Sequence, residues 1–387
     1  MKTKIYLDHA ATTPVRPEVL EESLPYFTEY YGNASGIYGV AKESKKALEH
    51  AREQVAHAIG ARKDEIIFTA GGSESDNMAL RGVAEALAEK GKHIITTQIE
   101  HHAILHTCAY LEKKGFRVTY LPVDEMGKVD PAAVEAAICP DTILISIMFA
   151  NNEIGTIEPI AQIGAIAKKH RVLFHTDAVQ AVGHVKIDVE AMQIDLLSMS
   201  GHKLGAPKGI GALYIRKGTP IRSLLYGGGQ EFGKRAGTEN IPGIVGLGKA
   251  IEIADTTMEE TLPKLTAMRD RLMNGILERV PDCRVNGDRV DRLPGNVNIS
   301  FIGIEGESLL LLLDALGIAA SSGSACTSGS LDPSHVLLAI GLPHEVAHGS
   351  LRMTLDYDNT DEEIDYVLEK LPGIVERLRQ MSPIYGK

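Results

Sequence analysis

Hydrophobic residues recur along the first two thirds of the chain in two patterns, short β-branched runs and longer helical repeats. The short runs predict seven strands, at residues 66–69, 93–97, 117–122, 143–148, 172–176, 195–199 and 212–215. Between several of these runs, apolar residues spaced along one helical face predict helices at 74–90, 102–114 and 161–170. Strands that alternate with helices form crossover units, so we expect an α/β fold with a mostly parallel seven-stranded sheet covered on both faces.

The pattern changes after a glycine-rich stretch at 227–237. An amphipathic segment at 262–280 is followed by mixed elements, with strands at 296–301 and 351–355 and helices at 307–316, 334–340 and 361–380. This order predicts a second, smaller α+β unit. We therefore expect a large domain of residues 15–255 and a small C-terminal domain of residues 256–387, completed by residues 1–14.

Composition narrows the class of protein. The 387 residues are 44% hydrophobic but contain no apolar run long enough to cross a membrane, so we expect neither a membrane partner nor export. A formal net charge of -11 argues against direct nucleic-acid binding. The four cysteines lie far apart without a CxxC pair, which predicts neither a disulfide framework nor a thiolate metal cage and indicates a reducing cytoplasm (Cys108, Cys139, Cys283 and Cys326).

Polar residues follow five of the predicted strands at the point where each strand ends. In open α/β sheets ligands bind beyond the carboxyl ends of the strands, so these residues are candidates for one shared site. They are Gly72 and Ser73, His101, Asn152, Asp177 with Gln180, and Lys203 with its neighbours Ser200 and His202. Their convergence is stronger evidence than any one of them, because each taken singly has an ordinary structural interpretation.

Lys203 is the most informative of these residues. It follows a buried strand and enters a turn rich in glycine and proline. Desolvation there lowers the pKa of a lysine toward the range in which its free amine attacks a carbonyl. Ser200 and His202 supply donors of the kind that bind phosphate. An amine beside a phosphate site is what pyridoxal phosphate requires, whereas the alternative is an ordinary solvated lysine.

The other strand-end residues allow two interpretations each. Asp177 would hold a pyridinium nitrogen protonated, or would cap a helix together with Gln180. The glycines before Ser73 would form an anion site at a helix start, or only a tight connection. His101 would overhang the ligand, or would be a solvated histidine at the start of a helix.

Two further motifs lie in the C-terminal part. Cys326 stands among small residues in the loop 320–333, as a nucleophilic thiol on an easily moved segment or as an incidental exposed cysteine. The run 344–348 reads HEVAH, which matches the zinc-protease pattern, but Pro343 and Gly349 leave barely more than one turn, so we predict no metal site. Arg352 suits bidentate capture of a substrate carboxylate.

With these residues in place, the chain resembles, essentially end to end, the cysteine desulfurases of the NifS/IscS type, a branch of the fold-type I pyridoxal-phosphate enzymes. The motifs that carry the resemblance are YLDHAATT at 6–13, ESDN at 74–77, NNEIG at 151–155, HTDAVQ at 175–180, SGHK at 200–203 and SGSAC at 322–326. The last motif, followed by PSHVL at 333–337, is similar to the long-loop group of that family. At 32–38 this chain has GNASGIY where the family usually has Gly-Asn-Pro-Ser-Ser-x-His, and Ser73 replaces a threonine.

The resemblance implies a role for each candidate. Lys203 would bind the cofactor covalently and His101 would stack on its ring, while Asp177 would pair with the pyridinium nitrogen and Gln180 with the ring oxygen. Asn152 and Arg352 would position the substrate carboxylate. The phosphate would be held by Gly72, Ser73, Ser200 and His202, joined by Thr238 from a second subunit.

The implied reaction converts L-cysteine to L-alanine and leaves the sulfur on Cys326 as a persulfide. A homodimer would then pass that sulfur to an acceptor such as an iron–sulfur scaffold protein or a thiolation partner. Two alternatives stay open. One is a related pyridoxal-phosphate lyase or aminotransferase in which Cys326 is dispensable, and the other is a non-catalytic docking component for assembly proteins.

Overall fold

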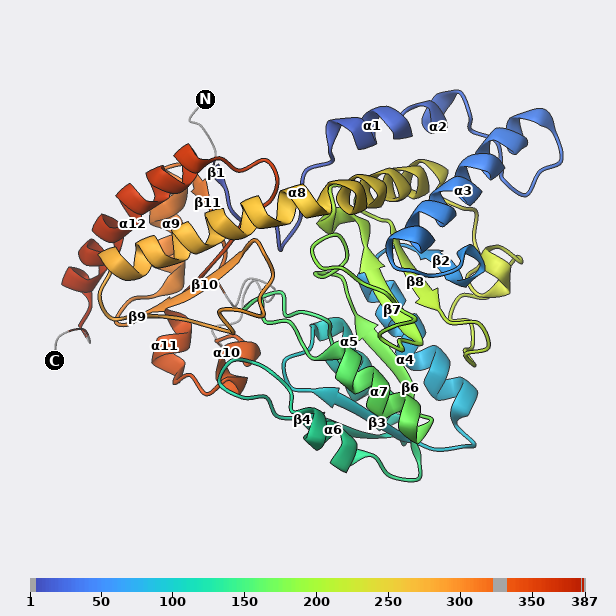
Figure 1. Cartoon of the computed structure of the whole chain (residues 1–387), viewed down its shortest axis with the longest axis horizontal. Helices are drawn as coiled ribbons and strands as arrows, with labels where there is room; N and C mark the ends of the chain where they lie inside the picture. The colour runs from blue at the N-terminus through green and yellow to red at the C-terminus, as the bar shows by residue number, and fades with distance from the viewer. Residues whose placement is uncertain (1–4, 323–332, 384, 386–387) are drawn as a thin grey trace.

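The computed structural model describes residues 5–322, 333–383 and 385. Its largest element is a seven-stranded sheet in the order β2-β8-β7-β6-β5-β3-β4 (Figure 1). Strand β8 runs antiparallel to β2 and β7, and the remaining neighbours are parallel, which confirms the expected mostly parallel sheet. The strands are β2 (Ile66–Thr69), β3 (His93–Thr97), β4 (Arg117–Leu121), β5 (Thr142–Ser146), β6 (Leu173–Asp177), β7 (Leu196–Ser200) and β8 (Gly211–Ile215).

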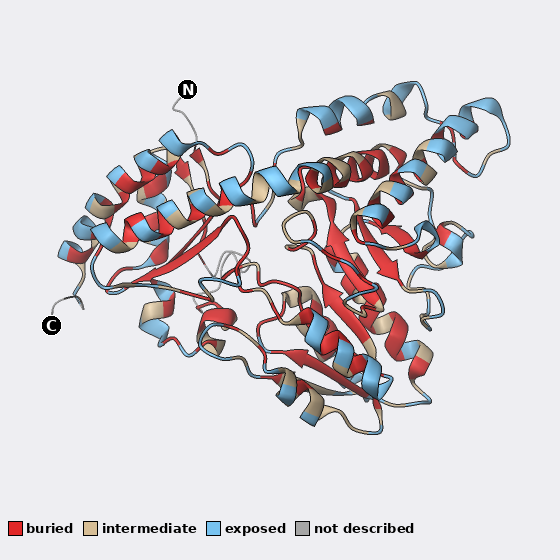
Figure 2. Ribbon diagram, in the orientation of Figure 1, coloured by how far each residue is buried: buried red, intermediate tan, exposed pale blue. Residues whose placement is uncertain are grey.

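Helices cover both faces of this sheet, because successive strand residues point to opposite sides. Ile94 packs with α4 (Gly72–Leu87) and α5 (His102–Lys113), whereas its neighbour Ile95 belongs to the core on the other face. Figure 2 shows the central strands of this sheet buried and its helices with one exposed side. The second face is covered by α3 (Gly39–Ala58), α6 (Pro131–Ala137), α7 (Ile160–His170) and part of α8 (Ile241–Arg279). Shorter helices complete this part: α1 (Pro17–Ser23), α2 (Pro25–Thr28), η1 (Lys63–Glu65), η2 (Gly201–Lys203) and η3 (Glu231–Gly233).

A second hydrophobic core lies in the C-terminal part of the chain. Buried residues of β10 and β12, among them Val297 and Met353, pack against helices. Strand β1 pairs in parallel with β11, so the N-terminal segment lies against this part of the fold. Its elements are β1 (Ile5–Tyr6), β9 (Cys283–Val285), β10 (Asn296–Phe301), α9 (Gly306–Ala315), β11 (Ile318–Ala319), α10 (His335–Ala339), α11 (His344–His348), β12 (Ser350–Thr354) and α12 (Asp361–Met381).

Helix α8 is continuous over 39 residues and contributes to both cores. Leu247 belongs to the core beside the large sheet, and Leu272 belongs to the C-terminal core. The domain boundary expected between residues 255 and 256 falls inside this helix. A Cβ added at Gly248 would lie 2.8 Å from the Ala51 Cα atom, so a glycine here allows α3 and α8 to approach closely.

The other predicted elements are present, with bounds that differ by three residues or fewer. The exception is α8, which begins at Ile241, 21 residues before the start of the amphipathic segment predicted at 262–280. Glycines in its first turns lower helix propensity, and burial of that part against α3 outweighs them. Within the described residues, no helix is long and apolar enough to cross a lipid bilayer.

Candidate active site

The carboxyl edge of the large sheet brings most of the predicted site residues together. Asp177 ends β6, Ser200 ends β7, and Lys203 follows in η2. His101 caps the N-terminus of α5, where its Nδ1 atom accepts a hydrogen bond from the Ala103 amide at 3.1 Å. A pocket beside them is lined by residues from both cores, including Ala10, Gln180, His184, Lys203, Asn296 and Thr354.

Asp177 is a buried carboxylate whose desolvation is only partly offset by neighbouring charges and one hydrogen bond. Burial raises its pKa, and the nearby charges of His101 and Lys203 oppose that rise. Its Oδ1 atom accepts a hydrogen bond from the Val179 amide at 3.0 Å, as a capping residue does. This contact closes a turn rather than a helix start, because no helix follows Asp177 in the described residues, so the predicted cap with Gln180 does not form.

A second layer of acids lies behind Asp177. Ligand atoms of Asp76, His101 and Asp177 all lie within 4.8 Å of one another. Burial, and then the charge of Asp177, raises the pKa of Asp76 well above its usual value. Burial also raises the pKa of Glu100 to about 8, although its carboxyl group accepts from the Thr97 hydroxyl at 2.7 Å. Burial thus favours the neutral form of the outer acids, whereas the charges of His101 and Lys203 favour the ionised form of Asp177.

The N-terminal segment closes one side of the site. The Lys203 Nζ atom donates to the carbonyl oxygens of Ala10 at 2.5 Å and Ala11 at 2.7 Å. Gln180 Nε2 donates to the Ala10 carbonyl at 3.1 Å, and His202 Nδ1 lies 3.1 Å from the Thr12 hydroxyl. Burial lowers the pKa of His202 to about 4, so its ring is neutral at neutral pH.

The turn from β2 into α4 is shaped to admit an anion. Gly71 has φ +148° and ψ −176°, a conformation that L side chains rarely adopt. A Cβ at Gly72 would approach Val179 Cγ2 to 2.6 Å, so the bare backbone is needed for this close packing. The first amides of a helix have no intrahelical partner, and here they open beside Ser73 and Ser200.

Arg352 enters the site from β12 and is only 3% exposed. Its Nη2 donates to Asp8 Oδ1 at 2.8 Å and its Nη1 donates to the Asn152 carbonyl at 3.2 Å. Its buried Nε atom has no hydrogen-bond partner among the residues that the structure describes. A buried guanidinium with an unused donor is suited to bind a carboxylate from a ligand.

Both ends of the segment that carries Cys326 are anchored beside this site, although Cys326 itself lies outside the described residues. On one side, the backbones of Ser321 and Arg352 exchange hydrogen bonds of 3.0 and 2.7 Å. On the other side, the Ser334 hydroxyl donates to the buried carboxyl group of Glu153. His335 adds a contact of 3.0 Å to the Glu100 carbonyl oxygen.

Two predicted features stand apart from this arrangement. Thr238 is exposed in the segment after η3. His344 and His348 are exposed on the short helix α11, and no group of three potential metal ligands found in the described part of the chain includes them.

Four acids of the site had no assigned role in the sequence interpretation: Asp8, Asp76, Glu100 and Glu153. Asp8, Asp76 and Glu153 lie inside motifs that carry the resemblance, and Glu100 precedes His101. Glu100 also comes three residues after the end of β3, which was the one positional signal for its burial. The partners of the others come from distant segments, as Ser334 does for Glu153, and spacing along the chain does not reveal such pairs.

Comparison with known proteins settles the family. A sequence profile of the class-V aminotransferases matches residues 5–367. The cysteine desulfurase IscS of Clostridium botulinum is 61% identical over 387 residues, which is 100% of this chain and 98% of the relative. The chain belongs to the cysteine desulfurases of this family. These enzymes depend on pyridoxal phosphate.

Solved structures of this desulfurase's relatives agree with the sequence comparison. A NifS-like protein superposes with a TM-score of 0.92 at 41% identity, covering 97% of this chain and 100% of that one. SspA, solved in complex with cysteine, has a TM-score of 0.82 at 40% identity and covers 92% of this chain and 99% of its own. The expected fold-type I architecture is thereby confirmed.

Proposed function

We propose that this desulfurase binds pyridoxal phosphate at the carboxyl edge of its large sheet and converts L-cysteine to L-alanine, with the sulfur passing to Cys326. The observation that carries the proposal is the placement of the buried Asp177 carboxylate between His101 and Lys203. A carboxylate in that position is costly to bury unless a cationic ligand compensates it.

The donor set fits this cofactor on three counts. Asp177 offers a carboxylate to the pyridinium nitrogen, and Lys203 offers a primary amine to the aldehyde carbon. Gly71 and Gly72 leave bare backbone at the start of α4, where a Cβ at Gly72 would meet Val179. The phosphate would be held there by Gly72, Ser73, Ser200 and His202, with Gln180 near the ring oxygen and Thr238 donated by a second subunit.

Bound pyridoxal phosphate supplies an electron sink for the bonds at the substrate's α-carbon. The residues of the chain do the remaining work. Arg352, with Asn152, binds and orients the substrate carboxylate. The Lys203 amine would be the base that holds and returns the α-proton. His101, whose pKa burial lowers, is a neutral imidazole that can exchange a proton with the substrate thiol.

Sulfur transfer requires a thiolate within reach. In the overall reaction the substrate's Cβ–S bond breaks, an S–S bond forms on Cys326, and L-cysteine plus the Cys326 thiol becomes L-alanine plus the Cys326 persulfide. Cys326 follows the anchored Ser321 by five positions in the sequence, and a chain of that length reaches at most about 18 Å at about 3.5 Å per residue. The persulfide would then pass to an acceptor such as an iron–sulfur scaffold or a thiolation partner.

The proposed enzyme is a homodimer of the cytoplasm. Around Thr238 the chain exposes large hydrophobic side chains, with Tyr226 at 85% and Phe232 at 54%, which favours a partner surface over that segment. A second copy seated there would bring its own Thr238 to the phosphate. Cysteines without a disulfide pattern support a reducing compartment.

Borohydride reduction followed by peptide mass spectrometry tests the cofactor assignment. The cofactor should be fixed to Lys203 in the parent chain and in Lys208→Arg, an exposed lysine of the same turn. It should not be fixed in Lys203→Arg. Fixation elsewhere, or none after adding cofactor, would overturn the proposal and favour a non-catalytic docking role.

Mass spectrometry after L-cysteine treatment tests the sulfur step. We expect an adduct of about 32 Da on Cys326, absent in Cys326→Ser and retained in the control Cys283→Ser. Normal alanine turnover by Cys326→Ser would instead identify a lyase or aminotransferase that does not use this thiol.

A further inference from the structure

A cluster of three potential ligands lies at the opposite edge of the large sheet from the candidate active site. His93 is the first residue of β3, whereas the active-site histidine His101 follows the other end of that strand. Cys139 and Asp141 lie in the connection between α6 and β5. The two segments are already held together, because the His93 amide donates to the Asp141 carbonyl at 3.0 Å.

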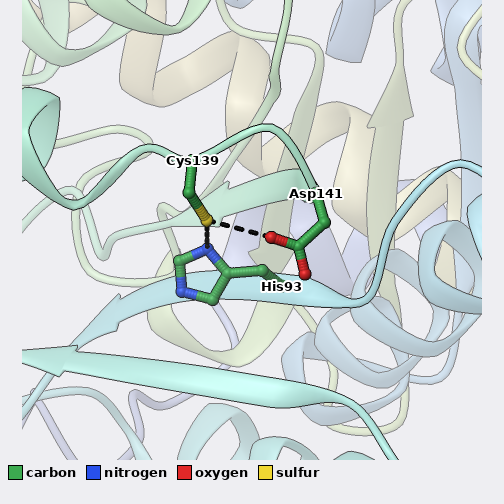
Figure 3. A group of neighbouring side chains, drawn as sticks. All are labelled: His93, Cys139 and Asp141. Carbon is green, nitrogen blue, oxygen red and sulfur yellow. Dashed lines mark hydrogen bonds between the residues drawn. The ribbon is translucent and has the colours of Figure 1, made fainter.

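The three side chains point toward one another (Figure 3). Cys139 Sγ lies 3.1 Å from His93 Nδ1 and 3.1 Å from Asp141 Oδ1, and all the ligand atoms lie within 4.8 Å of one another. An imidazole nitrogen, a thiolate sulfur and a carboxylate oxygen are the three donor types that proteins offer to Zn²⁺. They come from two segments 46 residues apart, so local sequence proximity does not account for the convergence.

His93 is prepared to coordinate through Nδ1. Its Nε2 atom lies 2.8 Å from the Thr119 hydroxyl, which can accept a hydrogen bond from Nε2–H and so leave Nδ1, the nitrogen that faces Cys139, unprotonated. The Thr142 hydroxyl, 2.7 Å from Nδ1, also contacts Cys139. An outer hydrogen-bond acceptor that fixes the tautomer is the usual companion of a metal-ligating histidine, and the Thr119 hydroxyl can take that role here.

Arg117 is the one cation in the cluster, with its Nη2 atom 3.1 Å from Cys139 Sγ and 3.0 Å from Asp141 Oδ1. Its side chain is 56% exposed, so it can move outward while staying near the carboxylate. Arg117 therefore occupies, in the structure, the charge position that a divalent ion would take.

We propose that His93, Cys139 and Asp141 form a binding site for one borderline-soft divalent cation of the Zn²⁺ class. The three side chains supply three ligands and leave the fourth to water. Cys139 also lines a surface hollow with Lys90, Pro140, Thr142, His170 and Arg171, which offers an entry path. Binding releases the Cys139 thiol proton to solvent and displaces Arg117 from the sulfur. The ion would tie the start of β3 to the start of β5, remote from the cofactor.

Cobalt titration of the full-length holoenzyme tests this proposal. The Cys326→Ser chain is used so that the catalytic thiol cannot bind metal, and chelator is removed by dialysis before Co²⁺ is added. We expect one Co²⁺ per chain, a thiolate-to-metal charge-transfer band in the ultraviolet, tetrahedral bands in the red, and displacement by Zn²⁺. Affinity should fall with decreasing pH, because the Cys139 thiol must lose its proton.

Variants assign the ligands. In this background Cys139→Ser should abolish the charge-transfer band, and the exposed Asp141→Asn should weaken binding by about tenfold or more. Thr119→Val should weaken it by about 10–100-fold through the ring orientation. Cys283→Ser and Arg117→Gln, which remove no ligand, should bind one Co²⁺ with the same band.

Metal-dependent thermal stability gives a second readout that does not rely on spectra. Saturating Zn²⁺ should raise the melting temperature of the Cys326→Ser chain and of its Cys283→Ser variant by the same amount, and should raise that of its Asp141→Asn variant by less at the same metal concentration. Binding without a thiolate band, the same band after Cys139→Ser, or no stoichiometric binding would overturn the proposal. The borohydride-reducible cofactor, measured in each variant, reports separately whether the proposed active site is intact.

Discussion

The Ser334 hydroxyl donates a hydrogen bond to the buried Glu153 carboxyl group, and so fixes the first turn of α10 to the residues that follow β5. Ser334 also caps α10 by accepting from the amides of Val336 and Leu337. The end of the Cys326-bearing segment is therefore set by the same stretch of chain that places Asn152 beside Arg352. Under the proposed mechanism, one stretch of chain would therefore position both the substrate-binding residues and one end of the segment that carries Cys326.

Replacing Ser334 with alanine removes this anchor. The buried Glu153 oxygen loses its donor and α10 loses its cap, so we expect stability to fall by about 1–3 kcal/mol, measured by chemical denaturation. We also expect alanine formation from L-cysteine to slow while the cofactor spectrum stays unchanged. Thr256→Ala, an exposed hydroxyl on α8, is the control. Unchanged turnover in the Ser334 variant would show that this end of the segment does not influence sulfur transfer.

Asp177→Asn keeps the shape of the side chain but removes its negative charge. If Asp177 pairs with the cofactor's ring nitrogen, turnover should fall by at least about 100-fold, because that charge is what keeps the electron sink protonated. The cofactor should still be fixed to Lys203 by borohydride, which distinguishes lost chemistry from lost folding. The exposed Asp314→Asn should retain full turnover. A variant as active as the parent would remove Asp177 from the mechanism.

Arg352→Lys preserves the positive charge but not the planar fork. The lysine cannot satisfy Asp8 and a substrate carboxylate at the same time, so the KM for L-cysteine should rise about tenfold or more while kcat changes less. Steady-state kinetics measure both parameters. Arg284→Lys, an exposed position on β9, should leave both unchanged. An unaltered KM would mean that the substrate carboxylate is bound elsewhere.

Glu158 makes stability depend on pH. Burial raises its pKa to about 8, so the folded chain holds a proton that the unfolded chain has already released at pH 5. Its contribution is therefore fully present below about pH 4.5 and is lost as the pH rises toward 8. Glu158→Gln should flatten this part of the profile of melting temperature against pH relative to the parent. The exposed Glu125→Gln should give a profile parallel to the parent's, and a parallel profile for Glu158→Gln would contradict the assignment.

The sequence predicted a residue's place in the site best where that residue directly follows a strand that can itself be recognised in the sequence. Asp177 and Lys203 could be placed at one edge of the sheet because strand ends align in parallel sheets. The start of α8 was missed because Gly243, Gly246 and Gly248 suggest a loop, whereas packing against other segments stabilises the helix there.

Pairings between distant segments escaped prediction. Arg352 could be proposed as a carboxylate binder, but its ion pair with Asp8 joins residues 344 positions apart. The cluster of His93, Cys139 and Asp141 was hidden for the same reason. Cysteine spacing alone argued against a metal site, whereas the register of β3 beside β5 brings the cysteine to a histidine. The closeness of Cys139 to His93 therefore becomes visible only in the folded sheet.

Helix α8 rises about 1.5 Å per residue over its 39 residues, which makes it a rod of about 58 Å. One half of the rod is embedded beside α3 and the other half beside α12 (Figure 1). Cutting the chain near residue 255 would divide α8, and each fragment would then have a hydrophobic core that is no longer covered by the whole helix. Because both cores share this helix, we expect them to unfold together in one cooperative transition.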